Sequence, residues 1–168
     1  MIKPLLLAAL TAMLLVGCNA RTSAPAAGLA FDSVSLRRDA CFGHCPVYNV
    51  EVKADGTISF TGKEYVKSLG PQRGTVSKDG LALLSLAVQH ADLPAMRPRY
   101  LEESDGCKSV ATDLPSLTIT VTRAGATRTV MFYHGCFGMG ALATRLGWLA
   151  DTIDEIAGTG QWIGYPAP

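Results

Sequence analysis

Apolar and polar residues alternate along much of the first half of the chain, which is the pattern of half-buried β-strands. The alternating segments are residues 34–36, 46–53 and 57–61. Asp55-Gly56 separates the last two, which predicts a hairpin with a two-residue type I′ turn, because both central positions of that turn need positive φ. A weaker strand is predicted over either 65–69 or 72–76, with a break at Gly70-Pro71.

Two other stretches repeat apolar residues every three or four positions, as amphipathic helices do. The first runs from Ser77, a good N-cap, to Ala91. Its predicted core positions are Leu81, Leu84, Val88 and Ala91, with Leu83 and Ala87 beside them. The second runs from Met139 to Ile156, with Trp148 off its apolar stripe and Gly158 as its stop.

The segment between these helices contains one more hairpin and one long connection. Residues 117–121 and 128–134 form the hairpin, with a turn at 123–126. Residues 95–114 are polar and irregular, and such a long loop needs something to hold it down. The resulting order, β-β-(β)-α-β-β-α, predicts an α+β fold: a two-layer sandwich in which an antiparallel sheet carries two helices on one face.

The N-terminus has the pattern of an export signal. Lys3 is followed by an apolar run from Leu5 to Val16, too short for the roughly 20 residues of a membrane-spanning helix. The run ends in Leu15-Val16-Gly17-Cys18, which resembles the lipobox of bacterial lipoproteins. That resemblance implies cleavage before Cys18, which then carries the lipid, and Asn19 after it implies the periplasmic face of the outer membrane.

We therefore divide the chain into three parts. Residues 1–17 are the signal peptide, 18–30 the lipidated Cys18 and a flexible tether, and 31–168 a single α+β domain. The tether is predicted from its Ala, Pro and Ser content, which offers little apolar surface to bury. In the tail, Trp162 and Tyr165 either form an exposed aromatic surface or fold back over the sheet, and we favour the second.

Charge excludes one class of partner. The net charge of the chain is +1, and removal of the signal peptide with Lys3 leaves 14 basic and 14 acidic residues. Nucleic-acid-binding domains usually carry a basic excess, so we expect no nucleic-acid partner.

Four cysteines remain beyond Cys18: Cys41, Cys45, Cys107 and Cys136. An even count in an exported protein indicates disulfides, although four cysteines allow three connectivities. If residues 117–121 and 128–134 pair as a hairpin, Cys136 lies just beyond its open end. The long loop that contains Cys107 enters the hairpin at that same end. That favours Cys107–Cys136 and Cys41–Cys45, with the other pairings left open.

A resemblance enters at Cys41-Phe42-Gly43-His44-Cys45-Pro46-Val47-Tyr48. With Thr112-Asp113-Leu114-Pro115 and Tyr133-His134-Gly135-Cys136, it is similar to a family of domains of unknown function common in bacterial envelope proteins. The family is marked by Cys-Phe-Gly-x-Cys-Pro-x-Tyr before a hairpin with Asp-Gly. The similarity covers residues 34–157 and implies fold and location, with no activity.

The cysteines also allow a second function. Cys41-x-x-x-Cys45-Pro46 has the spacing of copper-handling thiols in Sco-type chaperones, and His44 and His134 could complete a soft donor set. In that family, however, the motif opens a helix, whereas here it opens a strand. A thiol-based copper carrier or redox protein is therefore the alternative hypothesis.

Catalysis has little support in the sequence. The three histidines, His44, His90 and His134, accompany no nucleophile elbow or triad motif. We expect a non-enzymatic module without a cofactor, anchored to the membrane by lipid, that binds an envelope protein or glycan.

Overall fold

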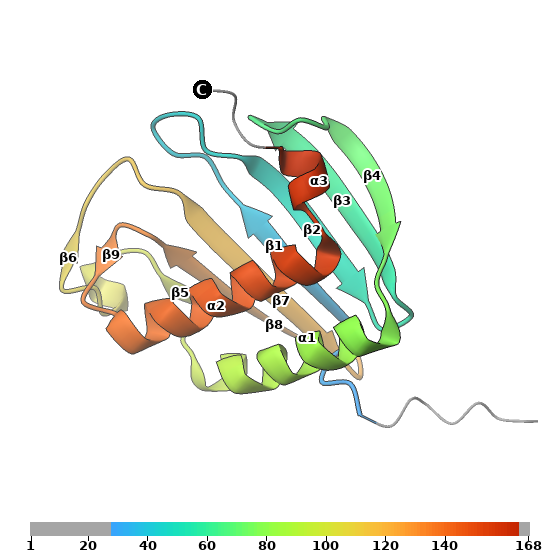
Figure 1. Ribbon diagram of the computed structural model, residues 1–168. Coiled ribbons are helices and arrows are strands. Elements are labelled where there is room, and N and C mark those ends of the chain that lie inside the picture. Colours follow the sequence, from blue (N-terminus) through green and yellow to red (C-terminus); the bar gives the residue numbers. More distant parts are fainter. Residues whose placement is uncertain (1–27, 165–168) are drawn as a thin grey trace, which may run out of the picture.

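The computed structural model describes residues 28–164, and Figure 1 shows an open sheet with the long helices packed across one face. The strands of this sheet are β1 (Ser33–Arg38), β2 (Val47–Lys53), β3 (Thr57–Glu64), β4 (Gly70–Thr75), β5 (Arg99–Tyr100), β7 (Ser116–Arg123) and β8 (Ala126–Tyr133). Their order is β4-β3-β2-β1-β7-β8-β5. All neighbours are antiparallel except β5 and β8, which run parallel. The predicted α+β class is confirmed.

The core lies between the sheet and two helices, α1 (Lys78–Ala91) and α2 (Gly140–Ala157). Both lie on the same face of the sheet, as predicted (Figure 1). Ser77 caps α1 by accepting a hydrogen bond from the Gly80 amide, and Gly158 ends α2 in a left-handed conformation. Leu83 departs from the prediction. Its side chain is exposed on the outside of the helix layer, because the core stripe of α1 passes through Leu81 and Leu84 instead.

Four strands precede α1, more than the order β-β-(β)-α-β-β-α counts. The alternating segment at residues 34–36 is β1, which that order left uncounted; it lies between β2 and β7 and so joins the two halves of the sheet. The weaker strand is β4, which includes the Gly70-Pro71 pair that had been read as a break. Proline is tolerated there because β4 is an edge strand.

Both hairpins form, but the predicted type I′ turn is not at Asp55-Gly56. Three residues separate β2 from β3, and of these only Gly56 has positive φ. This is the arrangement of a three-residue loop that closes on a glycine. The two-residue turn with positive φ at both positions is Ala124-Gly125, between β7 and β8.

The long connection between α1 and β7 is built from short pieces. They are two 3-10 turns, η1 (Leu93–Ala95) and η2 (Glu103–Asp105), and the strands β5 and β6 (Ser109–Val110). Strand β6 pairs with β9 (Cys136–Phe137), the short strand before α2. The Asp105 carboxylate binds the Leu101 amide and Arg99, so backbone and ion-pair contacts hold this segment in place.

The chain folds back over the sheet after α2, as we had favoured. The short helix α3 (Gly160–Ile163) places Trp162 on the core, where its ring lies 5.0 Å from that of Phe60. The Ser68 amide donates to the Trp162 carbonyl at 2.9 Å, which ties α3 to the connection between β3 and β4. Tyr165 lies outside the described residues.

At the other end, ordered packing begins before residue 31. Ala30 is buried, and its amide donates to Ser85 Oγ of α1 at 2.7 Å. The predicted signal peptide, Cys18 and most of the predicted tether lie outside the described residues.

Candidate functional site

The most distinctive local feature is the loop between β1 and β2, which contains the cysteine motif. Cys41 and Cys45 form a disulfide, with Cα atoms 5.7 Å apart, and close a small ring. Gly43 at φ +145° sits inside it, in a backbone conformation that side chains rarely adopt. The favoured pairing is confirmed at this site.

Phe42 points outward from this ring. Its side chain is 87% exposed, the most exposed of the large apolar residues between 28 and 164. Its amide donates to the Asp113 carbonyl at 3.0 Å, so the ring is fastened to the segment before β7. A covalent ring and a backbone hydrogen bond thus hold the backbone of an exposed aromatic residue in place.

Other exposed side chains lie at the same end of the sheet. Strand β1 ends, β2 begins, β3 ends and β7 begins here, as their pairing registers require. The His44 ring meets Tyr65 edge-on at a centroid distance of 4.9 Å. We call this end the loop edge, defined by Phe42, His44, Tyr65, Leu69 and Leu114, of which all are exposed.

Directly below the loop edge, a partly buried ionic cluster fixes the base of the loop. The Tyr48 hydroxyl donates to Asp154 of α2 at 2.7 Å, and Arg38 binds the same carboxylate at 2.8 Å. Arg38 also pairs with Asp151, and Thr159 Oγ1 donates to Asp154 at 2.9 Å. The tyrosine of the motif is therefore the residue that attaches its strand to α2.

The electrostatics of this cluster are those of a closed network. Burial raises the pKa of the Tyr48 phenol, and the neighbouring Asp154 carboxylate raises it further. Burial on its own would lower the pKa of the Arg38 guanidinium. The attraction of the Asp154 carboxylate is the larger effect in sum with its hydrogen bonds, and the pKa of the guanidinium is raised. Donors and acceptors satisfy one another, so the cluster joins β1 and β2 to α2.

His134 lies beside this cluster, half-buried at the end of β8. Burial lowers the pKa of its imidazole, and the positive charge of Arg38 lowers it further. Its amide donates to the Pro115 carbonyl at 3.0 Å. His44 lies elsewhere, against Tyr65, so the two histidines of the copper hypothesis have different neighbours.

The structure does not assemble the donor set of that hypothesis. Cys41 and Cys45 are bonded to each other, and within residues 28–164 no three His, Cys, Asp or Glu side chains are grouped to hold a metal ion. The other two cysteines form the second predicted disulfide, Cys107–Cys136, which is buried. It joins the long connection to β9 and supplies the tie that the loop was expected to need.

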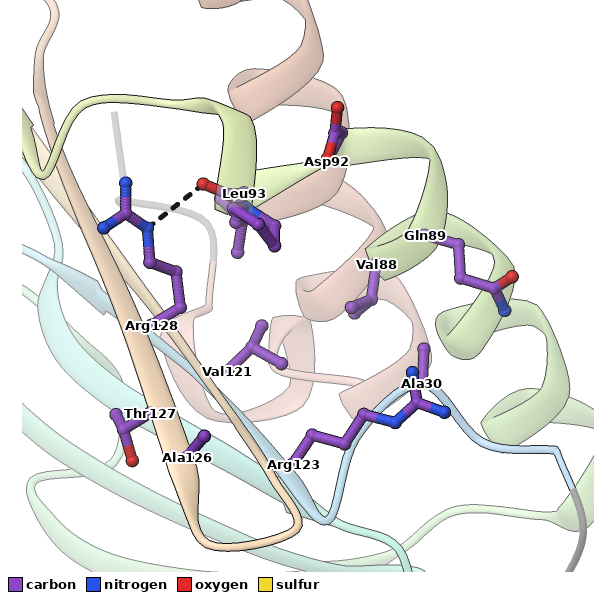
Figure 2. A pocket seen from close by; sticks show the side chains of 11 residues that line it. Ala30, Val88, Gln89, Asp92, Leu93, Val121, Arg123, Ala126, Thr127 and Arg128 are labelled. Atoms are coloured by element: carbon purple, nitrogen blue, oxygen red, sulfur yellow. Dashed lines mark hydrogen bonds between the residues drawn. The ribbon is translucent and has the colours of Figure 1, made fainter.

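A hollow of about 470 Å³ lies at the opposite end of the sheet, between the end of α1 and the β7–β8 hairpin (Figure 2). Its floor is apolar, with Ala30, Val88 and Val121. Arg128 reaches over it, but its guanidinium donates to the Leu93 and Met96 carbonyls. The guanidinium of Arg128 is therefore engaged with backbone carbonyls of η1 and the residue that follows it.

Sequence reasoning found the loop but missed the ionic cluster beneath it. Arg38 and Asp154 are 116 positions apart, and their contact depends on how α2 crosses the sheet. The available signal was Tyr48, a phenol at a predicted core position that needed a polar partner once buried.

These features define a class: a two-layer α+β domain whose disulfide-closed loop is supported from below by a partly buried ion pair. The chain belongs to the family described as Domain of unknown function (DUF6438), which matches residues 32–157. A search of curated proteins found no match. None of the helices within residues 28–164 is long and apolar enough to cross a membrane.

Proposed function

We propose that this protein is a lipid-anchored, non-enzymatic binding module of the bacterial envelope. Residues 1–17 direct export, and Cys18 carries the lipid. The Leu15-Val16-Gly17-Cys18 sequence supports this location, with Asn19 favouring the periplasmic face of the outer membrane. Both disulfides support it too, because such bonds persist in oxidising compartments.

The observation that carries the binding role is Phe42, exposed on a disulfide-closed ring. An exposed aromatic side chain on a fixed backbone loses little conformational freedom on binding, and aromatic residues dominate interface energetics. The ring lies at the end of the sheet opposite the one where the described part of the chain begins (Figure 1). The loop edge is therefore free to meet a second envelope component, a protein or a glycan.

Crosslinking from the loop edge tests this role. A photoreactive phenylalanine analogue replaces Phe42 in cells, and the same analogue at Phe137, another exposed phenylalanine, is the matched control. We expect adducts from position 42 and none of the same mass from position 137. Adducts that contain peptides of a second protein identify a protein partner, and adducts shortened by muramidase identify a glycan. Identical patterns from both positions would reject the loop edge as the binding site.

The anchor has its own test. Cys18→Ser should abolish labelling by radioactive palmitate and release the protein from the membrane fraction, because the acyl chains supply the membrane affinity. Retention of an unlabelled variant in the membrane fraction would reject the lipid anchor while leaving the loop edge untouched.

The rival function is a thiol-based redox protein or copper carrier that uses Cys41 and Cys45. One observation favours its redox form: this disulfide is partly exposed, whereas Cys107–Cys136 is buried. Alkylation of denatured protein taken directly from the periplasm separates the two functions. We expect no free thiols among these four cysteines, and two free thiols or stoichiometric copper would establish the rival.

A further inference from the structure

We infer that the exposed side of α1, together with Trp148 of α2, lies against the lipid bilayer that holds the chain's own anchor. This rests on the proposed lipidation of Cys18. The contacting surface consists of Leu83, Leu86 and His90 of α1 and Trp148 of α2, which we call the outer stripe.

The side chains of the outer stripe form one continuous surface. Leu83 and Leu86 are 57% and 61% exposed, and their spacing of three places them on one side of α1. His90 follows one turn later, and its ring lies 5.3 Å from that of Trp148, which is 49% exposed. The surface thus runs along α1 and crosses to α2.

The exposed side of helix α1 has little of the charge that a water-exposed helix normally carries: after Lys78 and Asp79 in its first turn, its polar residues are Gln89 and His90 near its end. From Gly80 to Ala91 it contains no Asp, Glu, Lys or Arg. The apolar residues of its inner side are accounted for by the core, but Leu83 and Leu86 contribute nothing to it. Exposed leucines beside a tryptophan are the residues by which interfacial helices enter the boundary between lipid headgroups and acyl chains.

The position of the anchor identifies the bilayer as the occupant. A groove of about 660 Å³ runs beside α1, lined on one side by Leu81 and Leu86 and on the other by Gly28 and Leu29. Gly28 is thus both the first described residue and a neighbour of the outer stripe. Only ten positions separate it from Cys18, which is at most about 35 Å of chain and about 17–19 Å for a flexible one. The anchor therefore holds this apolar surface at a high local concentration of lipid.

This placement gives the domain an orientation. The outer stripe faces the lipid, and the uncovered face of the sheet, with Arg37, Asn49, Glu51 and Thr120, faces away. Because the contact is apolar, we expect it to be insensitive to salt.

Tryptophan quenching tests the inference in the full acylated protein. The protein is reconstituted into vesicles of phosphatidylethanolamine and phosphatidylglycerol, with or without brominated acyl chains. The chain has two tryptophans, and Trp162 is buried. We expect bromine to quench the wild type by at least a third, and Trp148→Phe, which retains only Trp162, by less than a tenth.

Leucine variants supply the second measurement. Leu83→Ser with Leu86→Ser should reduce the quenching of Trp148 at least twofold, whereas Leu69→Ser, an equally exposed leucine on the loop edge, should leave it unchanged. Vesicle flotation accompanies each sample. Protein that floats but shows equal quenching in the wild type and Trp148→Phe overturns the inference and leaves the anchor intact. Protein that is acylated but does not float rejects the anchor itself.

Other occupants give different results. A second copy of the chain would give unquenched Trp148 together with a dimer in sedimentation. A protein partner would give unquenched Trp148, a monomer, and protein crosslinks from position 86 in cells. Either outcome overturns the inference.

Discussion

The Tyr48 hydroxyl lies 2.7 Å and 2.8 Å from the two carboxylate oxygens of Asp154, and so attaches the strand after the Cys41–Cys45 loop to helix α2. The loop edge is therefore braced from below by a residue of its own motif. The contact spans 106 positions of the chain. It makes the orientation of the loop depend on the packing of α2.

Removal of this hydroxyl should weaken the fold. We expect Tyr48→Phe to lower the free energy of unfolding by about 2 kcal/mol, the range for a hydrogen bond to a charged group. Urea denaturation followed by circular dichroism measures it. Tyr65→Phe, at a half-exposed tyrosine of the loop edge, is the control and should change stability by less than about 0.5 kcal/mol. Equal effects of the two variants would contradict the bracing role.

The two disulfides should differ in their contribution to stability. Cys107 and Cys136 are separated by 29 positions, Cys41 and Cys45 by 4. Loop-closure entropy then predicts a loss of about 3–4 kcal/mol for the double alanine variant of the first pair and about 2 kcal/mol for the second. Thermal denaturation ranks the variants. A larger loss from the small ring would show that the ring does more for the fold than closure entropy explains.

His134 should make stability depend on pH. Its folded pKa is lowered by burial, so the unfolded chain binds a proton more readily. The stability associated with neutral His134 is complete above the unfolded pKa of about 6.5 and is lost as the pH falls towards the folded pKa. Between pH 7.5 and 5.5 the melting temperature of the wild type should therefore fall more than that of His134→Gln. Parallel curves for the two proteins would show that this imidazole is not coupled to folding.

Ser85 should control how the N-terminal segment docks. Ser85→Ala removes the acceptor of the buried Ala30 amide, which we expect to lower stability by about 1–3 kcal/mol. Amide hydrogen exchange should show lost protection at Ala30. Ser104→Ala, at an exposed serine, is the control. Unchanged protection at Ala30 would mean that Ser85 does not hold the segment.

Local patterns predicted the elements of this fold well. The alternation around Asp55-Gly56 gave a real hairpin, Ser77 caps its helix, and the apolar spacing identified both long helices. The turn at Asp55 was given the wrong type, because the number of loop residues depends on where the paired register ends. Leu83 was expected beside the core because the spacing of apolar residues does not show how much of the helix surface packs against the sheet. The buried side of α1 includes Leu81 and Leu84 but not Leu83.

Long-range relations were harder to predict. The register places β1 between β2 and β7, and no local signal in Val34 or Leu36 encodes those two neighbours. The Arg38–Asp154 pair depends on the same packing. The disulfide pairing was within reach only because the second hairpin returned Cys136 towards Cys107.

The edges of the sheet also have a consequence for the membrane attachment that we propose. Strand β4 presents Gly70-Pro71 and an alternating polar side, and β5 at the far edge has only two residues. Proline has no backbone N–H to offer, and a two-residue strand is a poor template for a neighbour. Copies confined to one leaflet by the proposed anchor would collide often and in similar orientations. Edge strands of this kind would let many copies lie side by side without pairing into one continuous intermolecular β-sheet.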